Sequence, residues 1–242
     1  NEKNNWFVSD QSLIKLEGNK YVSEKITFPS SNAKIQALII DGDIEYFGTN
    51  QGLWSRQNNR NAKLIKNINV LCLDRTSDGL IIVGAKKGFY YLKKGFLKKI
   101  TLDGQDYLSL SKTAVKDIEV TSENEIWYAT FGMGLFLQNP GTFTTINAKD
   151  GLDVGGMTFD LVKNGTKIYI ATKNGLFLYQ NSKIKKHYTK NDGLPSNMIL
   201  DLDIDSNGNL WIATANGLSK LSGSAFKNYS RRDGLPSKLV TT

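Results

Sequence analysis

The chain has 242 residues and a formal net charge of +8, which arises from 31 lysines and arginines against 23 aspartates and glutamates. A chain of this length can bury a sizeable core, and it contains no apolar run long enough to span a membrane. The lysines are spread along the expected outer strands and turns and are not interleaved with aromatic residues on one face. The composition therefore excludes a membrane span within the chain and argues against nucleic acid as a partner.

The N-terminal part contains three copies of one short pattern. A degraded copy begins at Trp6. A clearer copy begins at Tyr46, after the apolar run Ile35–Ile40, and a weaker one begins at Ile82, after the run Val70–Leu73. Short apolar runs bounded by turn residues are typical of buried strands. We therefore expect antiparallel strands here, with no helical periodicity.

The C-terminal part repeats the pattern more clearly. Its copies begin at Trp127, Tyr169 and Trp211. The last copy lies in the unit Asp192–Leu221, where Asp205–Gly208 is a tight turn and Asn216–Gly217 is a two-residue hairpin signal. Two hairpins within this unit predict an antiparallel meander.

The repeats have a period near forty residues. The anchors are Trp6, Tyr46, Ile82, Trp127, Tyr169 and Trp211, with spacings of 40, 36, 45, 42 and 42 residues. Such a period of short strands is typical of a propeller with about four strands in each blade. The lysine-rich segments Lys183–Tyr188 and Ala225–Tyr229 are expected to be exposed fourth strands. We therefore expect an all-β fold, a β-propeller of four-stranded antiparallel blades with six repeats visible.

We expect residues 1–242 to form a single β-propeller domain or a partial propeller, because no linker-like segment interrupts the repeats. Residues 234–242 align with 193–201 and stop partway along an inner strand, and the first repeat has no inner strand before Trp6. Either the C-terminal strand closes a six-bladed ring, or the chain is a fragment of a propeller with seven or more blades. The unfinished strand favours the fragment.

Residues for metal binding or nucleophilic catalysis are scarce. His187 is the only histidine and is expected to be exposed, while Cys72 is the only cysteine and is expected to be buried in an apolar strand. Two such residues far apart give no support for a zinc site. No nucleophile motif or phosphate-binding glycine motif accompanies them. We expect no metal site, no cofactor and no catalytic residue.

Three carboxylates occupy equivalent places in the inner strands: Asp117, Asp160 and Asp201. A lyase or glycosidase of the propeller kind needs suitably spaced acids, and these three would perturb one another's pKa if they met near the axis. Alternatively, each accepts hydrogen bonds from the backbone of a neighbouring blade. The segment Asp205–Trp211 also resembles the Asp-box turn of sialidases, which is structural there, although the full pattern is not met.

The second hairpin of each blade and the crossing to the next blade are expected on the same face. This face is rich in amides and hydroxyls, which suit sugar or peptide recognition. The candidate ligand-binding residues are Asn50, Gln51, Lys86, Phe131, Met133, Asn174, Asn197 and Asn216. In the alternative interpretation the asparagines are present because the turns require them. Phe131 and Met133 lie in a hairpin with one extra residue and are not needed by the turn.

The segment Asp192–Leu221 closely resembles the two-component regulator propeller repeat. It reads D-G-L-P-S-N-M-I-L-D-L-D-I-D-S-N-G-N-L-W-I-A-T-A-N-G-L-S-K-L. The match is good at Asp150–Leu178 and Asp233–Ser237, moderate near Tyr46 and Trp127, and weak near Ile82 and Trp6. The resemblance covers nearly the whole chain, but its signature consists of scaffold residues and specifies the fold far better than the ligand.

In that family, paired propellers form the periplasmic sensor of membrane-bound hybrid histidine kinases, and many respond to oligosaccharides. The resemblance implies a non-enzymatic, periplasmic, ligand-sensing segment of a two-component system. It further implies an oligosaccharide as ligand, and as partners the neighbouring propeller or β-sandwich domains of the same protein, or a second copy in a homodimer. Two alternatives remain open, namely a protein-interaction scaffold without a small ligand, and a propeller lyase or glycosidase that uses the inner-strand carboxylates.

Overall fold

The computed structural model describes residues 6–17, 20–29, 32–58, 60–99, 110–121, 124–139, 142–152, 155 and 157–241. The chain consists of two compact units, Asn1–Leu102 and Asp103–Thr242, called unit 1 and unit 2 below. Each described meander is antiparallel, and each consists of strands that follow one another in the sequence.

Unit 1 contains three meanders. The first consists of β1 (Trp6–Ser9), β2 (Ser12–Glu17) and β3 (Lys20–Lys25). The second consists of β4 (Ile35–Asp41), β5 (Ile44–Thr49), β6 (Gly52–Gln57) and β7 (Lys63–Lys66). The third consists of β8 (Val70–Arg75), β9 (Ile81–Ala85), β10 (Gly88–Lys93) and β11 (Phe96–Lys99).

Unit 2 contains three four-stranded meanders. The first is β12 (Ala114–Val120), β13 (Ile126–Phe131), β14 (Leu135–Asn139) and β15 (Thr142–Ile146). The second is β16 (Thr158–Asn164), β17 (Lys167–Thr172), β18 (Gly175–Gln180) and β19 (Lys183–Tyr188). The third is β20 (Ile199–Ile204), β21 (Leu210–Thr214), β22 (Gly217–Ser222) and β23 (Ala225–Tyr229).

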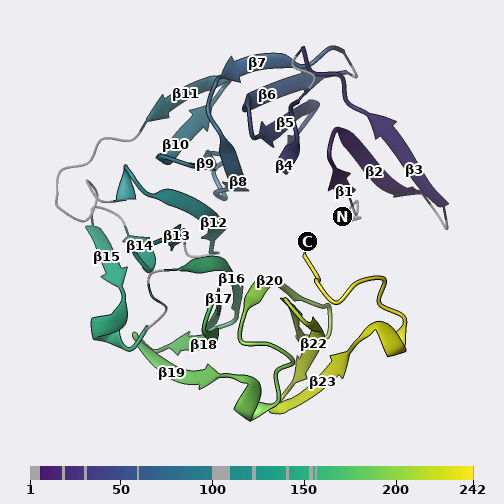
Figure 1. The fold of residues 1–242 in the computed structure, drawn as a ribbon. Coiled ribbons are helices and arrows are strands. Elements are labelled where there is room, and N and C mark those ends of the chain that lie inside the picture. Colours follow the sequence, from purple (N-terminus) through teal and green to yellow (C-terminus); the bar gives the residue numbers. More distant parts are fainter. Residues whose placement is uncertain are drawn as a thin grey trace. The chain divides into compact units, whose positions relative to one another are not determined.

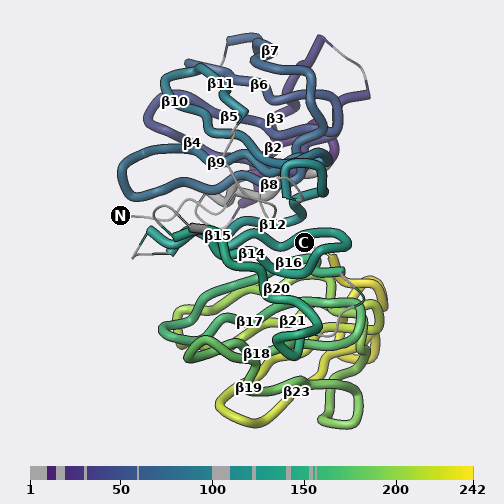
Figure 2. The backbone as a smooth tube through the Cα atoms, turned by 90° about the vertical axis from the view of Figure 1, so that its left-hand side faces the viewer, coloured from purple at the N-terminus to yellow at the C-terminus, as the bar shows by residue number. Residues whose placement is uncertain are grey.

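The first strands of successive meanders adjoin one another within each unit. In unit 2, β12 adjoins β16 and β16 adjoins β20, and in unit 1, β4 adjoins β8 (Figure 1). The later strands follow in sequence order, as the labels β4 to β7 and β16 to β19 show in Figure 2. The predicted four-stranded antiparallel blades, with an inner first strand and an outer fourth strand, are therefore confirmed.

Each unit has apolar clusters on both sides of its middle meander. In β17, Ile168 and Ile170 pack into a cluster with Trp127 and Phe177. Tyr169, which lies between them, packs into a second cluster on the other side. Successive strand residues point to opposite faces. Both faces of the strand are therefore buried, and for this reason the second strands are apolar without alternation.

A β-bulge follows the start of the first strand in every four-stranded meander. The register shifts lie between Ile35 and Ala37, Val70 and Cys72, Val115 and Asp117, Thr158 and Asp160, and Ile199 and Asp201. A bulge re-aims the side chains that follow it. The residue after the bulge is small or apolar in unit 1 and an aspartate in unit 2, and the buried Cys72 occupies this position, as expected for a core cysteine.

The Asp-Gly-Leu segments of unit 2 follow the fourth strand of each meander and contain short 3-10 turns: η1 (Ala148–Asp150), η2 (Lys190–Asp192) and η3 (Arg231–Asp233). Each turn carries a capping box, in which the aspartate accepts hydrogen bonds from the residue that caps the turn. The following glycine has a positive φ, for example +109° at Gly193. These residues of the repeat are thus required by the connection itself.

Candidate functional site

The hairpin between the second and third strands carries most of the predicted binding residues. Its first residue is a fully buried threonine in four meanders: Thr49, Thr130, Thr172 and Thr214. The threonine hydroxyl donates to the carbonyl of the glycine that begins the third strand, at 2.7 Å for Thr214 and Gly217. We call this hairpin the Thr–Gly turn, and the strand ends that carry it the Thr–Gly end.

The glycine of the Thr–Gly turn is fixed by a close approach of the fourth strand. Gly217 has a φ of +113°, and a Cβ atom there would lie 2.5 Å from the carbonyl oxygen of Tyr229. The hairpin predicted at Asn216–Gly217 is present, but its two turn residues are Ala215 and Asn216, because Thr214 pairs with Gly217. The conformation of Gly217 and the lack of space beside it therefore both require glycine.

Several predicted amides are engaged in holding turns. Asn50 accepts a hydrogen bond from the Lys34 backbone at 2.7 Å and donates to the Asn32 carbonyl at 3.2 Å. The side chain of Asn197 accepts from the Lys190 backbone, and that of Asn216 donates to the Pro195 carbonyl. This is the structural role that turn chemistry predicts for asparagine, and ligand contact by these residues stays a prediction.

A cleft of about 640 Å³ lies at the Thr–Gly end of unit 1. Its lining residues are Asp10, Gln11, Ser12, Lys25, Asn32, Ala33, Lys34 and Asn50. An ion pair joins Lys34 Nζ and Asp10 at 3.2 Å. Of the ligand-binding residues predicted in unit 1, Asn50 lines this cleft. Gln51 and Lys86 do not line it, although Lys86 is exposed at a corresponding turn.

In unit 2, apolar side chains are exposed at the Thr–Gly end. Phe131 is 48% and Met133 37% exposed, in the turn that has an extra residue. The backbone of Phe131 pairs with that of Met157, just before β16. Sequence reasoning missed Met198, which is 40% exposed and precedes β20 at the same place in the repeat. Met157 occupies the same position of the preceding repeat, before β16, and this recurrence of methionine could have identified Met198 from the sequence.

The three inner-strand aspartates form a row across unit 2. Asp117 accepts a hydrogen bond from the backbone N–H of Leu161 at 3.2 Å, and Asp160 accepts from that of Leu202 at 2.6 Å. Asp117 and Asp160 thus each join their own inner strand to the next one. This geometry favours the structural interpretation for Asp117 and Asp160 over the catalytic one.

One carboxyl group of the row has a raised pKa. Burial raises the pKa of Asp160 well above its ordinary value, and the charge and hydrogen bond of Asp117, with the charge of Asp201, raise it further. Two adjacent carboxyl groups that share a proton behave in this way. The raised pKa is what a general acid would need, but the bond to Leu202 engages the same carboxyl group in the scaffold.

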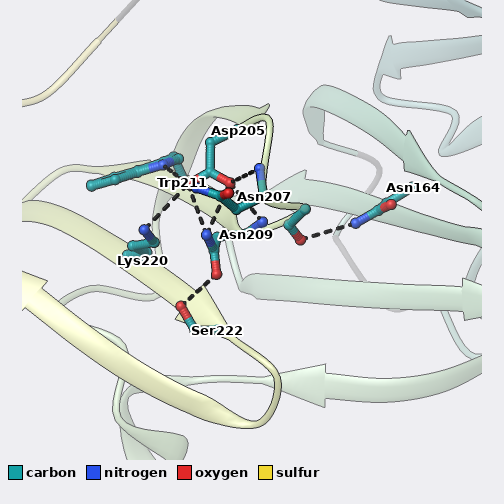
Figure 3. Close-up of polar contacts among 8 residues, drawn as sticks. Asn164, Asp205, Asn207, Asn209, Trp211, Lys220 and Ser222 are labelled. Carbon is teal, nitrogen blue, oxygen red and sulfur yellow. Dashed lines mark hydrogen bonds and ion pairs between the residues drawn. The ribbon is translucent and has the colours of Figure 1, made fainter.

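The carboxylate of Asp205 is fully engaged by residues of its own turn and of the two following strands (Figure 3). Its carboxylate accepts from the backbone N–H of Asn207 and Asn209 at 3.0 and 2.9 Å, and from Trp211 Nε1 at 3.1 Å, while Lys220 Nζ lies 3.2 Å away. The side chain of Asn209 is the largest cause of a pKa well below the usual range. The segment that resembles an Asp-box is therefore structural here.

His187 is exposed on β19, as expected, and is held in place by two contacts. Its ring stacks on Phe177 with centroids 4.0 Å apart, and Nε2 lies 2.9 Å from the carbonyl oxygen of Asn174. Among the described residues, no group of three or more histidine, cysteine, aspartate or glutamate side chains is placed to hold a metal ion. In the same part of the chain, no helix is long and apolar enough to cross a membrane.

The family comparison agrees with the repeat. Residues 193–216 match the family model of the two component regulator propeller. The resemblance expected from Asp192–Leu221 is thereby confirmed for this segment. No curated protein matches the chain significantly.

Solved structures with a similar fold cover nearly the whole chain. The extracellular domain of a protein described as a hybrid two component system from B. thetaiotaomicron has a TM-score of 0.74 at 18% identity, covering 97% of this chain and 35% of that chain. Another extracellular domain from that organism, described as a one component system, has a TM-score of 0.67 at 20% identity, covering 90% and 32%. A catalytically inactive virginiamycin B lyase from Staphylococcus aureus has a TM-score of 0.72 at 14% identity, covering 96% and 85%.

These likenesses show that the fold is of the β-propeller class, as predicted. The chain spans about one third of the length of the two extracellular domains. The similar structures include both sensor domains and an enzyme. A shared fold does not determine the function, which has to be argued from the site.

Proposed function

We propose that this chain is the ligand-sensing propeller segment of an extracytoplasmic, periplasmic two-component sensor, that it has no catalytic activity of its own, and that its ligand is an oligosaccharide. The repeat match at residues 193–216 and the two extracellular domains of similar fold support the sensor class. The ligand is proposed to bind at the Thr–Gly ends. Neighbouring propeller or sandwich domains, or a second copy of the chain, would receive the signal.

The observation that carries the proposal is the exposure of Phe131 and Met133. Neither side chain is needed by the core or by the Thr–Gly turn, and an exposed aromatic ring is a suitable surface for the apolar face of a sugar. In unit 1, the cleft beside Asn50 offers amides, a hydroxyl and two lysines. A few convergent polar groups beside an apolar surface are typical of small-molecule sites.

A thermal-shift screen against oligosaccharides of many linkage types tests the proposal, with short peptides as the control ligands. A ligand at one hundred times its Kd adds about 2.7 kcal/mol to the unfolding free energy, which moves the midpoint by several degrees in a chain of this size. We expect a reproducible shift with one glycan class. The shift should fall in the Phe131→Ala and Met133→Ala variants.

The matched control is Phe96→Ala, because Phe96 is also an exposed aromatic residue but lies on the fourth strand β11. This variant should keep the full ligand-induced shift. An absence of any shift in the folded chain, with binding to a protein partner instead, would favour the scaffold alternative. Ligand turnover that stops in Asp160→Asn would favour the enzyme alternative.

A further inference from the structure

A second cleft lies in unit 1 at the strand ends opposite the Thr–Gly turns. It has a volume of about 760 Å³, within the range usual for small-molecule sites. Four turns form its rim: those joining β4 to β5, β6 to β7, β8 to β9, and β10 to β11. The cleft therefore lies between the second and third meanders, on elements that the proposed sugar site does not use.

Cationic side chains dominate the rim of this cleft. Arg60, Lys63, Lys93 and Lys94 are exposed and line it. Among the described residues, no ion pair joins any of these four to a carboxylate; Lys93 only lies near enough to Asp78 to help lower its pKa. Like charges brought together by two turns, β6 to β7 and β10 to β11, create a positive potential, which the low-dielectric walls of a cleft strengthen.

The two acids of the rim are already occupied. Asp41 forms an ion pair with Arg75 at 2.8 Å. Asp78 accepts a hydrogen bond from the Thr76 hydroxyl at 2.5 Å, which is the largest cause of its lowered pKa. The first contact joins the second meander to the third, and the second lies within the third meander, so both carboxylates already have partners. The excess of positive charge at the rim therefore remains available to a ligand.

The wall of the cleft combines three apolar residues with a buried arginine. Arg56 is only 5% exposed, and its guanidinium is held by Glu45 and, at 2.5 Å, by Glu24. Its charge is thereby more than offset by the two carboxylates, so Arg56 shapes the wall and only the rim cations remain to bind an anion. Beside it, Ile44 and Ile65 are half-buried and Tyr46 is buried.

We propose that this cleft binds a small organic anion, a carboxylate or sulfate group carried on a compact ring or apolar body. Arginine and lysine bind such groups through charge-assisted hydrogen bonds. The apolar wall would take the body of the ligand, while Arg60 and Lys94 take its charge. The inference does not depend on the proposed sugar site, since the two sites share no residue.

Isothermal titration of the whole chain tests this inference, with four probes. A uronic-acid disaccharide, a sulfated monosaccharide and benzoate carry the anion on different bodies, and a neutral disaccharide lacks it. We expect at least one anionic probe to bind, with an affinity that falls as salt is raised. The neutral disaccharide should not compete. The preferred anion identifies the body that the wall accepts.

The double variant Arg60→Gln with Lys94→Gln should weaken that binding by about tenfold or more, which corresponds to about 1.4 kcal/mol. Both side chains are exposed, so the fold should be retained. The matched control removes two exposed lysines of β19, Lys183→Gln with Lys185→Gln, and should leave the affinity unchanged. An equal loss in both double variants, an unchanged affinity in the first, or no binding of any anionic probe would overturn the proposal.

Backbone NMR gives an independent readout. The amide signals of Gly79 and Gly95, which line the cleft, should shift on titration with the anion. Those of Gly52 and Gly88, at the Thr–Gly end, should not. Shifts confined to the Thr–Gly end would place the anion at the sugar site and contradict the inference, whereas the proposed function would survive.

Discussion

Units 1 and 2 contain clefts at corresponding strand ends, and the two clefts have different chemistry. The cleft of unit 1 is bordered by four cations beside an apolar wall. The cleft of unit 2 has a volume of about 660 Å³ and contains Glu119, Glu125 and Lys163, together with Trp127 and Tyr179. In both units the apolar residues of the wall come from the repeat, whereas the charged residues come from the turns and strand ends that vary between repeats.

The difference extends to how charge is held. In unit 1, Arg56 is buried and bound by two glutamates. In unit 2, Lys163 Nζ lies 3.9 Å from Glu125, and both side chains are partly exposed. Trp127 instead packs edge-on to Tyr179 at 5.4 Å, so the wall of this cleft depends on aromatic packing. A repeated scaffold thus supports two clefts whose walls and charged residues are held by different interactions.

The largest expected effect is the loss of the ion network around the buried Arg56 of unit 1. Arg56→Met removes the cation and leaves Glu24 and Glu45 facing each other. We expect a loss of about 3 kcal/mol in unfolding free energy, since breaking a buried pair leaves an uncompensated charge. Urea denaturation followed by circular dichroism measures it.

The matched variant in unit 2 is Lys163→Met. A partly exposed pair at this distance contributes less than about 1 kcal/mol. Equal losses for the two variants would mean that the two clefts do not differ in the way their charges are held.

The second largest effect concerns the Thr–Gly turns. In Gly217→Ala, the new Cβ atom meets the Tyr229 carbonyl oxygen at 2.5 Å and the residue keeps a positive φ, so we expect a loss of about 2 to 3 kcal/mol. Gly223 also has a positive φ, of +63°, but an added Cβ atom would meet open space. The loss of unfolding free energy in Gly223→Ala should therefore be near 1 kcal/mol.

Gly52→Ala in unit 1 tests whether the stability loss of Gly217→Ala comes from the backbone. Gly52 does not have a positive φ, and an added Cβ atom would lie 2.5 Å from the end of the exposed Leu64 side chain. Trp54 Nε1 would lie 2.9 Å away and the Lys66 carbonyl oxygen 3.1 Å away, farther than the Tyr229 oxygen from Gly217. The loss in Gly52→Ala should therefore be smaller than that in Gly217→Ala. Thermal unfolding of the three variants ranks them, and a loss at Gly52 as large as that at Gly217 would contradict the assignment of the cost to the backbone.

A smaller effect on stability is expected from the row of aspartates in unit 2. In unit 1, Ala37 and Cys72 occupy the corresponding positions. Burial, aided by Asp117 and Asp201, raises the pKa of Asp160. A raised pKa in the folded state contributes stability that is complete below the ordinary value and is lost as pH rises through the folded value. In Asp160→Asn, the new side-chain amide can still accept the hydrogen bond from the Leu202 backbone N–H and can donate one to the Asp117 carboxylate.

The Asp160→Asn variant should therefore gain stability relative to the original chain as the pH is raised from about 4 to 8. The matched control is Asp203→Asn, which changes an exposed aspartate of β20, the first strand of the next meander. Its stability curve should run parallel to that of the original chain. Stability curves measured by urea denaturation at several pH values distinguish the two. Parallel curves for all three proteins would contradict the shared proton.

Much of the fold followed from the repeat, because the anchors at Tyr46, Tyr169 and Trp211 mark buried second strands and the turns between strands require particular residues. The bulge before Asp117, Asp160 and Asp201 could not be predicted, since it adds no distinctive residue. The role of Thr214 was missed because its buried hydroxyl looks, in the sequence, like any strand threonine.

The clefts were harder still to predict. The side chains that line the unit 1 cleft come from turns that differ between repeats, such as the one holding Arg60 and Lys63, and no periodic pattern brings them to one place. Phe131 and Met133 could be selected from the sequence because the extra residue in their turn breaks the repeat. Departures from a repeat are therefore better indicators of candidate sites than the repeat itself.

The smallest expected effect separates the two interpretations of the turn asparagines. Asn50 makes two side-chain hydrogen bonds to the backbone, at 2.7 and 3.2 Å, whereas no described contact holds the side chain of Asn174. Exposed hydrogen bonds of this kind contribute about 0.5 to 1 kcal/mol in total, so Asn50→Ala should lower the thermal midpoint slightly and Asn174→Ala should leave it unchanged. If Asn174→Ala nevertheless reduces the shift caused by an oligosaccharide, its amide serves the ligand and not the turn. If both variants affect only stability, the asparagines of the Thr–Gly ends are scaffold residues, and recognition at these ends depends on the departures from the repeat at Phe131 and Met133.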